Sequence, residues 1–209
     1  MKPDNFDFIG NFSTLWQVFL GAVLATVGGL AATQLEWHFE RKRRAQQAAM
    51  FFGEVLTTLH IILDIAHRTH GRGDPFGPIT LRMLRAGKRE IEIYDRNRET
   101  LFDLHDPKLR ARIHTLILRL SNPLESVLDT TDEIRAVETQ LRALDLTAEH
   151  REHLQERLAR LNASRDGGYE FTIESAGQLL DTVKALEVLS KQSFSGAERA
   201  EAEAAQSGT

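Results

Sequence analysis

The sequence contains no cysteine, and this absence excludes disulfide bonds, thiolate metal ligands and cysteine nucleophiles. It also lacks an excess of one charge sign, because 26 Lys and Arg residues face 30 Asp and Glu residues, for a formal net charge of -4. A chain of this balance is not a generally basic nucleic-acid binder, so we expect no nucleic-acid partner. The hydrophobic content of 42% excludes an intrinsically disordered chain and a protein with many membrane spans.

Charge is also missing from one long stretch of the chain, between Phe8 and Glu36. Within it, the segment Leu15–Leu35 has the length of a membrane span, since a bilayer core of ~30 Å needs ~20 apolar residues in a helix. Trp16 and Trp37 stand near the two ends of this segment, and indole rings favour the two membrane interfaces. The sequence therefore predicts a transmembrane helix over residues 15–35.

Two other interpretations compete with a span. The first is a buried helix of a soluble bundle, although such helices rarely lack charge over this length. The second is a secretory signal peptide cleaved after Ala31. The N-terminal region argues against cleavage, because Lys2 is outnumbered there by Asp4 and Asp7, whereas a signal peptide begins with net positive charge.

The orientation of the span follows from the basic residues that flank it. Residues 1–14 contain a single one, Lys2, and the other flank carries four in a row. Positively charged flanks stay in the cytoplasm, so residues 1–14 are expected outside and residues 36–190 inside. The same cluster is expected to lie near anionic lipid headgroups. This basic cluster consists of Arg41, Lys42, Arg43 and Arg44.

Small residues form a stripe within the span. Gly21, Ala25 and Gly29 recur at intervals of four, which places them on one face of a helix. Such stripes let two helix backbones approach closely, so this face predicts an oligomeric contact within the membrane; Gly and Ala are, however, common in spans of any kind.

Apolar periodicity continues beyond the basic cluster. No proline occurs between Phe12 and Asp74, so the span is expected to continue as one long helix until the glycine- and proline-rich segment Gly71–Pro78. A short helix is predicted over 79–86, residues 87–95 are ambiguous, and 97–104 are expected to form a turn or two. The buried face of the long helix is predicted from Phe52, Val55, Leu56, Leu59, Leu63 and Ala66.

Further helices are predicted from their start signals. Asp106 is an N-cap before Pro107, and Thr147 is a second N-cap. Pro123 is expected to kink or split the helix that follows Asp106. Asp166–Gly168 is expected to form a turn.

A last helix is predicted from Ala176 to Leu189, and the Ala-, Glu- and Ser-rich residues 191–209 are expected to be a disordered tail. The predicted fold class is all-α, with one N-terminal transmembrane helix that continues into a cytoplasmic bundle of four or five helices.

The layout resembles that of uncharacterised single-span bacterial membrane proteins with a small helical cytoplasmic domain. The resemblance covers most of the chain as an order of features: one span, a basic stop, a helix, and then a loose pattern. That pattern comprises Ile93-Tyr94-Asp95, Asn97, Leu101 to Leu104, Asp106-Pro107 and Ile113. The resemblance implies this architecture and a location in a bacterial inner membrane, but no activity and no site residue.

One group of residues has metal-ligand chemistry. His60, Asp64, His67 and His70 follow one another at steps of four, three and three, which places the first three on one flank of a helix. Imidazoles with a carboxylate are ligands for a Zn²⁺-like ion. The alternative is an ordinary amphipathic edge of the bundle. We identify no catalytic set and expect no cofactor.

These observations favour a membrane-anchored, non-enzymatic helical scaffold or sensor, which acts as a homo-oligomer or through a protein partner. A second hypothesis is a membrane-acting effector, such as a toxin or defence component, that oligomerises through its span. A third is a metal-binding protein that uses the His60, Asp64 and His67 flank.

Overall fold

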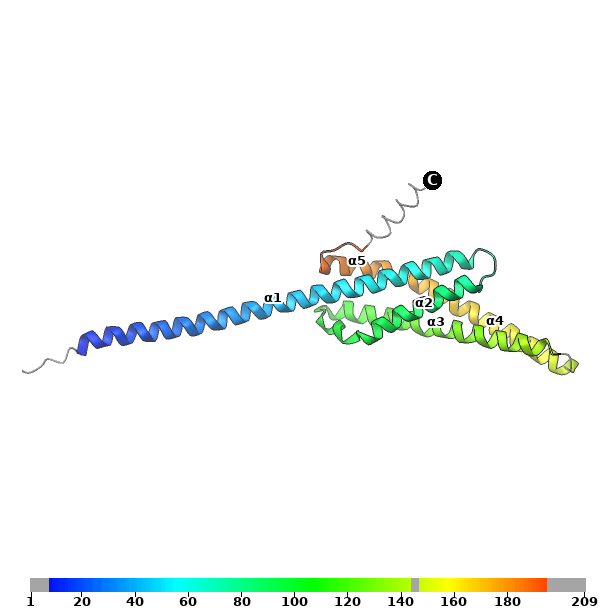
Figure 1. The fold of residues 1–209 in the computed structure, drawn as a ribbon, viewed down its shortest axis with the longest axis horizontal. Helices are drawn as coiled ribbons and strands as arrows, with labels where there is room; N and C mark the ends of the chain where they lie inside the picture. The colour runs from blue at the N-terminus through cyan, green and yellow to red at the C-terminus, as the bar shows by residue number, and fades with distance from the viewer. Residues whose placement is uncertain (1–7, 144–146, 195–209) are drawn as a thin grey trace, which may run out of the picture. The chain divides into compact units, whose positions relative to one another are not determined.

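A computed structural model describes residues 8–143 and 147–194 (Figure 1), and within these ranges every regular element is a helix. This confirms the predicted all-α class. The chain divides into two compact units, residues 1–44 and residues 45–209, called here unit 1 and unit 2. The elements are α1 (Phe8–His70), α2 (Pro78–Arg96), the 3₁₀ helix η1 (Arg98–Asp103), α3 (Pro107–Leu141), α4 (Ala148–Ala176) and α5 (Leu179–Ser190).

Unit 1 contains the first part of α1, in which large apolar side chains are exposed. The hydroxyls of Thr26 and Thr33 bond back to the carbonyls of Ala22 and Gly29, at 2.8 and 2.9 Å, so these polar groups are satisfied within the helix. Between 43% and 66% of the surface is exposed at Trp16, Phe19, Leu20, Val23, Leu24, Val27, Leu30, Leu35, Trp37 and Phe39.

In unit 2 the same helix carries a buried face. Burial begins just after the basic cluster, with Ala48 and Ala49. The predicted face is confirmed, since all six of its residues lie in one hydrophobic core that includes residues of α2, α3, α4 and α5. Burying each Leu or Phe side chain contributes ~1.5–3 kcal/mol, so this core fixes the last five turns of α1 within unit 2.

The second helix is longer than the sequence suggested. The predicted short helix 79–86 and the ambiguous residues 87–95 form the single helix α2, which begins at Pro78. Gly87 faces the core side of α1, where a Cβ atom would stand 3.5 Å from the side chains of Leu59 and Leu63, an ordinary contact distance. The glycine that interrupts the pattern is thus accommodated inside a helix and does not end it. The turn or two predicted over 97–104 corresponds to η1.

The helix α3 begins as predicted. Asp106 caps it, because its Oδ1 accepts hydrogen bonds from the backbone N–H groups of Lys108 and Leu109, at 2.8 and 3.2 Å. Pro123 does not split the helix, which runs from Pro107 to Leu141. Leu120 and Leu124 on either side of Pro123 are buried in the core, and their packing offsets the lost backbone hydrogen bond.

The helix α4 also begins at its predicted cap, with Thr147 Oγ1 accepting from the backbone N–H of His150 at 3.3 Å. The predicted turn at Asp166–Gly168 is wrong, because these residues lie inside α4. A Cβ at Gly168 would be only 3.1 Å from Val127 of α3, so a small residue is needed for α3 and α4 to approach. The helix ends at Ala176, so the last predicted helix begins at Leu179 instead.

The chain after α5 returns to α1. Lys191 adopts a left-handed conformation (φ 59°) that ends the helix, and Phe194 is buried against Gly53. A Cβ at position 53 would overlap the Phe194 ring, so this contact requires the glycine. Of the predicted tail, residues 195–209 lie outside the described residues, as do residues 1–7 of the predicted extracytoplasmic segment.

Replacing Gly167 by Ala tests the helical state of the segment predicted to be a turn. A Cβ at Gly167 meets nothing within 4 Å, so Gly167→Ala should raise the free energy of unfolding by ~0.5–1 kcal/mol. The measurement is chemical unfolding of the full chain in detergent. Gly73→Ala is the control and should destabilise, because Gly73 has a φ of 94°. A destabilised Gly167→Ala variant would contradict the helix.

Candidate functional site

The histidine flank of α1 is the first candidate. The structure places His60 partly buried, and its Nδ1 is buried without a hydrogen-bond partner. Asp64 pairs with Arg68 one turn further along the helix. This ion pair uses the carboxylate that the predicted metal site requires.

The other two histidines contact α4. His67 Nδ1 and the Tyr169 hydroxyl share a hydrogen bond of 3.4 Å. The His70 ring stacks on the Tyr169 ring, with centroids 4.0 Å apart and planes 13° from parallel. Tyr169 itself is 4% exposed. The two imidazoles therefore join α1 to a residue about one hundred positions away.

Phe76, from the loop between α1 and α2, completes this cluster. Its ring meets the His70 ring edge to face at 5.0 Å and the Tyr169 ring at 5.6 Å. The guanidinium of Arg165 lies 3.7 Å from the centroid of the Phe76 ring, a cation–π contact, and it also pairs with Asp166 at 3.2 Å. We call these residues the Tyr169 cluster: His67, His70, Phe76, Arg165 and Tyr169.

Burial in the Tyr169 cluster changes the acid–base behaviour of two members. Loss of solvent lowers the pKa of His70 below 6.5, with smaller lowering effects from His67 and Arg165 and an opposing effect from Asp166. Burial raises the pKa of Tyr169 to about 12. Both pKa shifts favour the uncharged forms of His70 and Tyr169, whose rings stack in this cluster.

The predicted metal set is not assembled. Across residues 8–143 and 147–194, no group of three or more His, Asp or Glu side chains is placed to hold a metal ion. His67 and His70 face Tyr169 and Asp64 pairs with Arg68, so the common helix flank does not give a common centre. The alternative of an amphipathic bundle edge describes the geometry better.

A second tyrosine–histidine pair, Tyr94 with the half-buried His114, could not be recognised from the sequence. The fully buried Tyr94 of α2 packs against Phe52 and places its hydroxyl 3.2 Å from His114 Nδ1 on α3. Burial raises the pKa of Tyr94. No local signal links the two residues, because each lies within an unremarkable helical pattern.

The predicted packing stripe lies on an open helix surface. A Cβ atom at Gly21, Gly28 or Gly29 would meet nothing within 4 Å, and Ala25 is exposed. In the basic cluster, all four side chains are exposed, and Arg44 pairs with Glu40 at 2.5 Å. Both features of unit 1 therefore remain available for contacts with another molecule.

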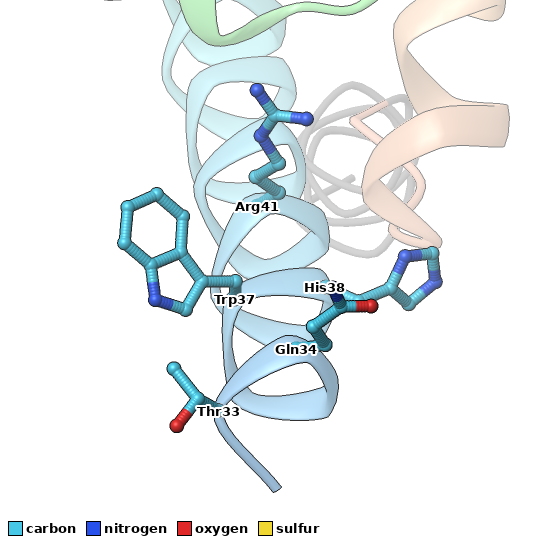
Figure 2. Close-up of a pocket in the computed structure, with 5 residues that line it drawn as sticks. All are labelled: Thr33, Gln34, Trp37, His38 and Arg41. Carbon is cyan, nitrogen blue, oxygen red and sulfur yellow. The ribbon is translucent and has the colours of Figure 1, made fainter. Parts of the chain in front are cut away.

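Beside the basic cluster, α1 has a hollow of about 500 Å³ (Figure 2). Trp37 and His38 project to opposite sides of the helix, with Arg41 one turn beyond and Gln34 one turn before. Thr33 completes the described lining. The hollow thus combines an aromatic ring, three nitrogen-bearing polar side chains and a hydroxyl.

One helix among the described residues, Phe19–His70 of α1, is long and apolar enough to cross a membrane by length and composition. Its qualifying window has a mean hydropathy of 1.6 and is 50% buried. Because residues 19–44 are exposed, a half-buried window lies in the unit 2 part of α1, which is a core helix. This hydropathy therefore describes the core helix, and the exposed apolar segment of unit 1 has to be judged by its own composition and exposure.

Comparison of the chain with protein-family models, curated proteins and solved structures finds no match.

The Tyr169 cluster predicts a pH dependence of stability. Because the folded state lowers the pKa of His70, the unfolded state binds more protons below pH 6.5, and stability should fall as pH decreases through that range. We expect His70→Gln to reduce the loss of thermal stability between about pH 7 and pH 5 in the full chain. The control is His150→Gln, at an exposed position. Equal losses in both variants and the unmodified chain would contradict this role of His70.

Proposed function

We propose that α1 anchors the chain in a bacterial inner membrane as a single span, and that unit 2 is a non-enzymatic scaffold or sensor that binds a protein partner. The observation that carries the anchor is a contrast within one helix. Leu24 and Leu30 are 66% and 64% exposed, whereas Leu56 and Leu59 are fully buried. Burial of apolar surface is favourable by ~25 cal/mol per Å². A bilayer would therefore stabilise Leu24 and Leu30 by the same kind of burial that the core provides for Leu56 and Leu59.

The flanks support the orientation. Trp16 and Trp37 are both exposed at the two ends of the apolar segment, as interfacial indoles require. The basic cluster follows Trp37, and such clusters remain on the cytoplasmic side. In the proposed arrangement unit 2 is therefore cytoplasmic.

Membrane anchoring has a direct test. Val27→Arg, in the middle of the apolar segment, should reduce insertion by ~2.5–3.5 kcal/mol and shift the protein into the carbonate-extractable fraction. Phe39→Arg is the matched control, because it lies beyond Trp37, and it should remain in the membrane. External protease should leave unit 2 intact in spheroplasts and degrade it in inverted vesicles. Complete carbonate extraction of the unmodified chain would refute the span.

Exposed apolar residues on unit 2 support the partner contact. Val188 of α5 is 79% exposed and Phe102 of η1 is 74% exposed. These are large values for large apolar side chains, and an interface is where such side chains become buried. Neither side chain contributes to the core, so both can be changed without disturbing the fold.

We expect Phe102→Asp with Val188→Asp to abolish cross-linking of unit 2 in membranes while leaving thermal stability unchanged. Glu99→Asp is the control on η1. Unchanged cross-linking in the double variant would contradict this surface.

The effector hypothesis is supported by the open glycine surface of the span. Growth arrest with loss of membrane potential on expression, relieved by Gly21→Leu with Gly29→Leu, would favour it over the scaffold.

A further inference from the structure

The hollow beside the basic cluster gathers hydrogen-bond donors on one face of α1. Gln34, Trp37, His38 and Arg41 follow at steps of three, one and three, so at ~100° per residue they fall within an arc of about 100°. All four line the hollow, and Figure 2 shows them projecting from one stretch of α1. None of these side chains has a hydrogen bond or ion pair to another described residue. They are therefore available to a ligand.

The charge of this face is positive. Glu36 and Glu40 lie about 200° and 240° around the helix from Gln34, outside the arc of the four donors, with Glu40 about 60° from Trp37. Glu40 also pairs with Arg44. Arg41 is thus the charged group of the hollow, with no carboxylate beside it on the same face, and the amide and indole N–H groups add further donors. This combination suits an anion with several acceptor oxygens.

The same face becomes apolar towards the N-terminus. Val23, Val27 and Leu30 lie within about 40° of the position of Gln34 around the helix axis. They are 43%, 58% and 64% exposed. The face thus runs from branched apolar side chains to a cluster of donors over about five helical turns. This is the polarity of a phospholipid, with acyl chains at one end and a phosphate at the other.

The opposite face suits a different contact. Gly21, Ala25 and Gly29 lie about 140° to 220° from Gln34 around the helix. Close packing of a second helix on these small residues would leave the face of the hollow turned towards lipid. Protein and lipid contacts would not compete for the same side of α1.

We propose that the hollow is a binding site for an anionic phospholipid, with the phosphate of the headgroup on Arg41, Trp37, Gln34 and His38 and an acyl chain along Leu30, Val27 and Val23. This site rests on the proposed membrane anchoring. The proposed site goes beyond a general attraction of the basic cluster to the membrane surface, because it assigns the selectivity for anionic over neutral lipids to one face of α1.

The experiment compares two arginines of equal charge on opposite faces. The full chain with Trp16→Phe is reconstituted in vesicles of phosphatidylcholine and phosphatidylglycerol, so that Trp37 is its only tryptophan. Quenching of Trp37 by brominated phosphatidylglycerol, relative to brominated phosphatidylcholine, reports the preference for the anionic lipid. Arg41→Gln lies in the hollow, and Arg43→Gln, about 160° away around the helix, is the matched control.

We expect Arg41→Gln to weaken the preference for phosphatidylglycerol about fivefold and Arg43→Gln to change it by less than about twofold. Equal losses in the two variants would overturn the site, because a diffuse surface charge would then explain the selectivity. An absence of preference in the unmodified protein would overturn it as well. If the proposed membrane anchoring itself fails, the result is distinguishable, because neither brominated lipid would then quench the fluorescence of Trp37.

Discussion

The buried face of α1 in unit 2 is the surface on which the rest of that unit depends. This face meets α2 through Phe52 and Tyr94 and the chain after α5 through Gly53 and Phe194, and beside it the exposed His67 meets Tyr169 of α4. These contacts lie along more than four turns of one helix. Since α1 carries no proline, it provides a continuous surface, and each neighbour is fixed relative to the others through it.

Glycine has two different structural roles in this chain: some glycines end helices, and others lie inside them. The sequence alone could not distinguish the two roles, which limited the prediction of helix boundaries. Gly71 and Gly73 end α1, as their clustering with proline indicated. Gly87 and Gly168 lie inside helices instead, and Gly168 lies where α4 closely approaches α3. A glycine that permits close packing has no local signature, because the neighbour that needs the space lies far away in the sequence. The capping residues Asp106 and Thr147 were predictable, since a cap acts within three residues.

The histidine flank shows the same limit for a candidate site. Helical spacing correctly indicates that His60, Asp64 and His67 share a side of α1, but it cannot supply what faces that side. The structure places Tyr169 there, and its stacking with His70 replaces metal chemistry with ring packing. A ligand set needs side chains that converge from several directions, and a single helix flank rarely provides this convergence.

The basic cluster lies where the two kinds of apolar surface on α1 meet. Before it, apolar side chains are exposed, and after it they enter the core from Ala48 onward. In the proposed span, a deeper position in the bilayer would bring Glu36 and then Glu40 and Arg41 into hydrocarbon, at up to ~2.5–3.5 kcal/mol for each charge, so these charged residues together limit the depth of insertion. Arg41 is the first basic residue among them, and it is also the residue that the hollow offers to a lipid phosphate.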